Sequence, residues 1–106
     1  MATEVNEMTM EPSHPGEILR ATVLPALGMT VKDVAGHLGV SRAALSELVN
    51  EKRSVSLDMA RRLGQAFGNG ARFWLALQMQ YDLWHAEHSA EAGRITVKPL
   101  KARKVA

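Results

Sequence analysis

The segment from Val31 to Asn50 constrains the fold more than any other feature, because it sets two short helices around a three-residue turn. It reads VKDVAGHLGVSRAALSELVN. The turn needs a residue that tolerates left-handed backbone angles, and Gly39 supplies it. Helices that cross steeply need a small residue at their contact, and Ala35 is small. The apolar positions beneath the turn are Val34, Leu38, Val40, Leu45 and Leu48. Together these features predict a helix-turn-helix.

The rest of the chain favours an all-α fold with five helices. Capping residues and glycine stops place them at about 14–27, 30–38, 41–50, 56–67 and 71–88, with Pro25 interrupting or ending the first. We expect residues 1–13 to be a disordered leader, 14–89 the domain and 90–106 a basic flexible tail. The first 17 residues hold four acids and no Lys or Arg, whereas Arg94 to Ala106 holds five bases and no acid.

Composition excludes several classes of protein. A chain of 106 residues fits one domain with tails, and 46% hydrophobic residues allow a real core. Because there is no cysteine, disulfides and thiolate chemistry are excluded. No apolar run is long enough to span a membrane, and we expect a cytoplasmic protein. His85 and His88 are too few ligands for a metal site, no residue set nominates a reaction, and no cofactor is expected.

The second helix of the motif would place its N-terminal end in the major groove of DNA. Arg42 is the best candidate to donate hydrogen bonds to a guanine, and Ala43 could contact a thymine methyl. Glu47 could accept a hydrogen bond from a cytosine amine, or could simply pair with a nearby basic side chain. Phosphate would be held by Asn50, Lys52, Arg53 and the amide end of the helix that begins at Thr30. Ser41 and Ser46 complete the outward face. For Ser46 and Glu47, ordinary solvated surface is an equal alternative.

The last helix offers a means of dimerisation, which such domains use to place two recognition helices in successive major grooves. All five aromatic residues lie between Phe67 and Trp84, and this helix is apolar around much of its circumference. A small domain can hardly bury all of it, which favours a homodimer. The alternative is a central core helix. The predicted dimerisation residues are Phe73, Trp74, Leu77, Tyr81 and Trp84.

The segments HPGEIL, LVNEKRSVSLDMARRLGQAFG and ARFWLALQMQYDL, together with the helix-turn-helix, resemble the HigA family of antitoxins within the Xre and lambda-repressor-like group. The resemblance runs from about His14 to Glu87. It implies a homodimer that binds and represses its own promoter and silences a RelE-like toxin, a ribosome-dependent mRNA endonuclease. It assigns base reading to Ser41, Arg42, Ala43 and Glu47. The acidic leader and the first helix are plausible surfaces for a basic toxin.

Two positions depart from the family pattern. Glu51 stands where a glycine is common after the recognition helix, which implies mild strain if the backbone there has positive φ. Gly36 lies inside a helix, at a cost of about 1 kcal/mol relative to alanine. Two alternatives therefore stay open beside an antitoxin that represses its own operon. One is a solitary regulator without a toxin, and the other is a protein-interaction module that has lost DNA binding.

Overall fold

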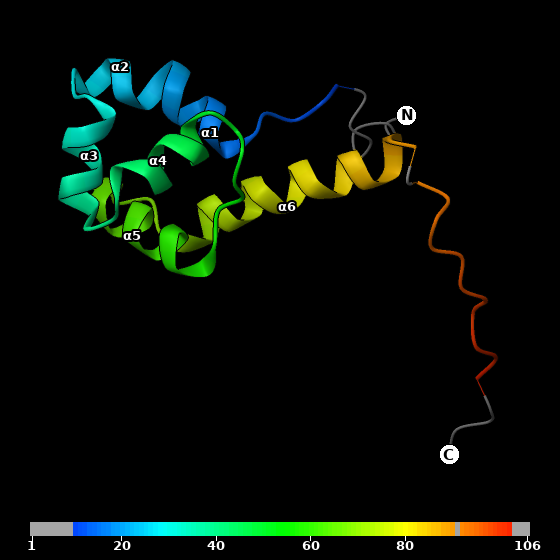
Figure 1. Cartoon of the computed structure of the whole chain (residues 1–106). Coiled ribbons are helices and arrows are strands. Elements are labelled where there is room, and N and C mark those ends of the chain that lie inside the picture. The colour runs from blue at the N-terminus through cyan, green and yellow to red at the C-terminus, as the bar shows by residue number, and fades with distance from the viewer. Residues whose placement is uncertain (1–9, 91, 103–106) are drawn as a thin grey trace, which may run out of the picture.

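The computed structural model describes residues 10–90 and 92–102, and the described chain is helical without strands (Figure 1). Most of the predicted leader, residues 1–9, and the last residues of the predicted tail, 103–106, lie outside it. The elements are α1 (Pro15–Ile18), η2 (Leu19–Val23), α2 (Leu24–Leu27), α3 (Val31–Leu38), α4 (Arg42–Val49), α5 (Leu57–Phe67) and α6 (Ala71–His88). Because α1, η2 and α2 follow without a break, this is the predicted five-helix fold.

Pro25 interrupts the first helical segment instead of ending it. Proline has no N–H, so a regular α-helix cannot continue through it without losing a hydrogen bond. The chain widens into the π-helical turn η2 just before this position, where the N–H of Leu24 donates to the carbonyl of Leu19. The segment then continues to Leu27 and ends at Gly28, which is left-handed with φ 67°.

The start of α1 is fixed by its first three residues. His14 is buried, and its Nδ1 accepts a hydrogen bond from the N–H of Gly16 at 2.8 Å. Pro15 occupies the first helical position, where a missing N–H costs nothing. Gly16 presses against α4: a Cβ there would lie 1.8 Å from the carbonyl oxygen of Leu48. The HPGE segment therefore sets how α1 packs on α4.

One hydrophobic core joins all five helices. The buried side chains include all the apolar positions predicted beneath the turn except Val40, which is half-buried. Trp74 is the largest fully buried side chain, and its Nε1 donates to Asn69 Oδ1 at 2.9 Å. The core residues are Leu19, Val34, Ala35, Leu38, Leu45, Leu48, Val49, Val55, Met59, Ala60, Leu63 and Trp74.

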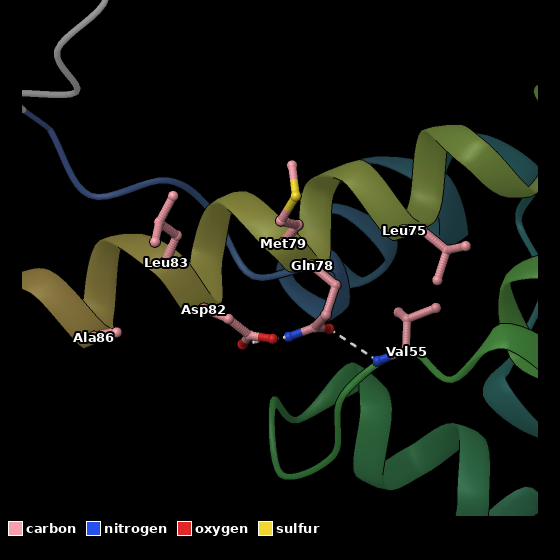
Figure 2. Close-up of a pocket in the computed structure, with 7 residues that line it drawn as sticks. All are labelled: Val55, Leu75, Gln78, Met79, Asp82, Leu83 and Ala86. Atoms are coloured by element: carbon pink, nitrogen blue, oxygen red, sulfur yellow. Dashed lines mark hydrogen bonds between the residues drawn. The ribbon is translucent and has the colours of Figure 1, made fainter. Parts of the chain in front are cut away.

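Helix α6 crosses the domain and continues beyond the other helices, and the C-terminal segment leaves from its far end (Figure 1). Its buried Gln78 ties the α4–α5 loop to this helix, since Oε1 accepts from the N–H of Val55 at 2.8 Å and Nε2 donates to Asp82 at 2.9 Å (Figure 2). Farther along, Glu11 of the N-terminal segment lies 2.7 Å from His85 Nε2. Within the described chain, no helix has the length and apolar character needed to cross a membrane.

Candidate nucleic-acid interface

The turn between α3 and α4 has the geometry that the sequence predicts. Gly39 is left-handed, with φ 75°, and its N–H donates to the carbonyls of Ala35 and Gly36. Arg62 of α5 stabilises the turn, because its Nη1 donates to the carbonyl of Leu38 at 2.8 Å and to that of Gly39 at 3.3 Å. Ser41 then starts α4 by accepting from the N–H of Ala44 at 3.0 Å. The two helices are thus held at a fixed angle.

Helix α4 presents one continuous polar face to solvent. At about 100° per residue, positions 42, 43, 46, 47 and 50 fall within a sector of about 140°. Arg42, Ala43, Glu47 and Asn50 are exposed, and Ser46 is half-buried. Leu45, Leu48 and Val49 lie on the opposite side, in the core. The helix is therefore anchored along one side and open to a partner along the other.

Some of the predicted contact residues already have partners in the chain. The hydroxyl of Thr30 accepts from the N–H of Asp33 at 3.1 Å, and that of Ser41 caps α4. Asn50 folds back on its own helix, where Nδ2 donates to the carbonyl of Ser46 at 2.9 Å. These groups define the helix ends. The Asn50 amide also donates to Ser46 Oγ at 3.4 Å, so what these groups leave for a phosphate is the first-turn backbone N–H groups of α3 and α4 that the two hydroxyls do not cap.

Both acidic side chains of this surface are paired with arginine. Glu47 accepts from Arg53 at 2.7 and 3.0 Å. Glu51 accepts from Arg20 of η2 at 2.8 Å, and the same guanidinium donates to the carbonyl of Val49 at the end of α4. Glu51 has φ 62°, the only positive φ at a residue other than glycine in the described chain. The strain expected at Glu51 is therefore present, and its charge is balanced.

Two of the cations that remain for a partner stand at the two ends of α4. Neither the Arg42 nor the Lys52 side chain takes part in an ion pair or hydrogen bond with the described residues, and both are exposed. Arg42 stands in the first turn of α4, and Lys52 in the loop after it. This is the placement that base reading by Arg42 and phosphate binding by Lys52 require.

The predicted dimerisation residues divide between core and surface. Trp74 is 1% exposed, so it is a core residue and cannot form part of a partner surface. Tyr81 packs against His14 and His85, and Trp84 stacks on His88, with ring centroids 4.2 Å apart. Leu77 is half-buried against the core. Phe73, at 43% exposure, is the one of the five that is exposed.

Sequence reasoning missed three side chains that shape this surface. Arg20 lies 31 positions before Glu51 in the chain, and Arg62 lies 23 positions after Gly39. Gln78 holds the α4–α5 loop from α6. All three reach their partners across the fold, so the local periodicity of the sequence carries no sign of them.

Comparison with known proteins agrees with this geometry. The family model HTH_3, a helix-turn-helix, matches residues 19–74. The chain belongs to this family. It is 43% identical over 90 residues to virulence-associated protein A' of Dichelobacter nodosus, which covers 83% of this chain and 77% of that protein.

Two solved structures extend the likeness to antitoxins. The Pseudomonas aeruginosa antitoxin HigA with the higBA promoter matches with a TM-score of 0.76 and 39% identity, over 85% of this chain and 99% of that one. The antitoxin GraA in complex with its operator matches with a TM-score of 0.78 and 36% identity, over 91% of this chain and 98% of that one. The resemblance to HigA antitoxins is therefore confirmed. The family consists of DNA-binding regulators and antitoxins, so the expectation that this chain is not an enzyme is also confirmed.

Proposed function

We propose that the chain is an antitoxin that binds operator DNA through α4 and represses the operon from which it is expressed. The observation that carries the proposal is the open polar face of α4, with Arg42 at its N-terminal end unpaired among the described residues. The relatives HigA and GraA are solved with a promoter and an operator, which supports DNA as the partner. Because its target is DNA, we place its action in the cytoplasm.

The position of each residue on this surface determines whether it contacts a base or a phosphate. Arg42 donates to guanine O6 and N7, and Ala43 contacts a thymine methyl on the same face. The backbone N–H groups at the starts of α3 and α4, beside Thr30 and Ser41, face phosphates, as does Lys52. Arg20 and Arg53 keep the carboxylates of Glu51 and Glu47 from repelling the DNA.

We further propose a homodimer that uses the surface of α6. Leu75, Met79, Leu83 and Ala86 lie at spacings of four, four and three residues and so form one stripe along the helix. They line a shallow apolar groove, and Met79 and Leu83 are 61% and 54% exposed (Figure 2). A second copy of α6 would cover this stripe. Met79→Lys should then lower the mass seen by light scattering, whereas Gln80→Lys, at an exposed polar position, should not; a parent protein that is already monomeric would contradict the dimer.

The proposed toxin partner is RelE-like, as the resemblance to HigA antitoxins implies. Co-expression with the adjacent small basic reading frame, followed by purification through a tag on this chain, tests it. Co-purification with loss of toxicity supports the antitoxin. If no such reading frame is adjacent, the chain is a solitary regulator.

DNA binding is tested by a gel shift on DNA from upstream of the gene, with unrelated DNA as competitor and at several salt concentrations. We expect a discrete complex that survives excess competitor. If upstream and unrelated DNA compete equally at every salt concentration, the repressor proposal is wrong, and a protein-interaction module is the better description.

A further inference from the structure

The ion pair between Glu47 and Arg53 uses only half of the carboxylate. Arg53 Nε and Nη2 both donate to Oε1 of Glu47, at 3.0 and 2.7 Å. Oε2 accepts no hydrogen bond from any described residue. On the arginine side, Nη1 and the second proton of Nη2 have no acceptor among the described residues. The pair therefore presents one free acceptor and several free donors to whatever covers α4.

The position of this pair argues against a purely structural role. The Glu47 and Arg53 side chains are 50% and 49% exposed, and an ion pair so open to water adds little to folding stability. Glu47 lies one helical turn after Ala43, on the face of α4 that carries Arg42. An unpaired carboxylate at this position would be repelled by the phosphates of bound DNA. Arg53 removes that repulsion and fixes the direction of the carboxylate.

We propose that Glu47 is a specificity-determining residue, which accepts a hydrogen bond from the N4 amino group of a cytosine through Oε2 while Arg53 holds Oε1. This rests on the proposed operator binding. In the major groove, guanine presents N7 and O6, and thymine presents O4, all of which are acceptors that repel a carboxylate. Adenine sets its N6 donor beside the acceptor N7, which suits an amide better than a carboxylate. Cytosine is therefore the base that Glu47 selects, and Arg53 is a positioning residue.

The test measures binding of the full chain to upstream DNA and to a set of its single-base variants, by fluorescence anisotropy. Glu47→Gln should change the preferred base at one position of each half-site from cytosine to adenine, with a change in relative affinity of about tenfold or more. Arg53→Ala should weaken the preference for cytosine at that same position, and Arg53→Lys, which keeps the charge but not the two-pronged contact, should restore it only in part.

Lys52→Ala is the matched control, because it removes a neighbouring cation that has no partner on α4. It should weaken binding to every sequence alike and leave all base preferences unchanged. In a Glu47→Ala background, Arg53→Ala should likewise lose its effect on base preference, because the reading side chain is gone. Thermal unfolding of each variant shows whether the domain is intact.

Three results would overturn the proposal. If the wild type prefers upstream DNA and Glu47→Gln retains every base preference, Glu47 does not read a base. If Arg53→Ala behaves like Lys52→Ala, Arg53 is a phosphate contact only. If the wild type shows no preference for any DNA, the proposed function fails first, and this proposal fails with it.

Discussion

Replacing Glu51 measures how two opposing effects balance in the loop just after α4. Its left-handed backbone, φ 62°, costs about 1–2 kcal/mol for a residue with a Cβ. Its ion pair with Arg20 is partly exposed, at 45% for Arg20 and 33% for Glu51, and is worth only about 0.5 kcal/mol after screening by solvent. Glycine would remove both the strain and the ion pair. It would also lower the free energy of unfolding by about 0.5–1 kcal/mol, because glycine has more conformational freedom in the unfolded chain.

These terms nearly cancel for Glu51→Gly, so we expect a free energy of unfolding within about 1 kcal/mol of the wild type. Glu51→Gln is the matched control, because it loses the ion pair but keeps the strain, and it should be the less stable of the two by about 1 kcal/mol. Urea unfolding followed by circular dichroism measures both. If Glu51→Gly is less stable than Glu51→Gln, the entropy cost of glycine exceeds the relief of strain, and the reasoning is wrong. Both variants should bind DNA more tightly, since each removes a negative charge.

Three further predictions concern packing, protonation and the loop after α4. Gly16→Ala should lower the free energy of unfolding by about 1–3 kcal/mol, because the new Cβ would collide with the backbone of Leu48. Gly36→Ala is the control, because the space around Gly36 is open, and it should raise the free energy of unfolding by about 1 kcal/mol. Equal effects of the two substitutions in urea unfolding would contradict the contact between Gly16 and Leu48. Burial lowers the pKa of His14. The contribution of neutral His14 to stability is therefore complete above about pH 6.5 and is lost as pH falls from there through the folded-state pKa. His14→Asn, which can still cap α1, should flatten the decline in Tm between pH 7 and 5. Gln78→Ala should cost about 1–3 kcal/mol by leaving the buried N–H of Val55 without an acceptor, and unchanged hydrogen exchange at Val55 would refute that role.

The helices could be predicted because their signals are local. Thr30, Ser41 and Ser56 cap three helices as expected, and Gly39 closes the turn in the left-handed conformation. Each of these features depends on residues only a few positions apart, which is the range over which capping and periodicity act. The same local signals placed the outward face of α4 correctly.

The features that escaped prediction depend on tertiary contacts. An apolar pattern on α6 could not tell the core side, with Trp74, from the open stripe with Met79 and Leu83. Glu51 has a balanced charge only because Arg20, far away in sequence, reaches it. Such contacts follow from how helices pack, which periodicity alone does not specify.

The central claim is that α4 reads DNA through Arg42, and it is tested by the ratio of affinities for upstream and unrelated DNA. The ratio should be measured for the wild type, Arg42→Ala and Lys52→Ala at several salt concentrations. We predict that Arg42→Ala lowers the ratio by about tenfold or more, corresponding to about 1–3 kcal/mol, and that Lys52→Ala weakens both affinities equally and reduces the salt dependence. If Arg42→Ala leaves the ratio unchanged, or if the two variants behave alike, α4 does not read the operator in the way that its exposed face indicates.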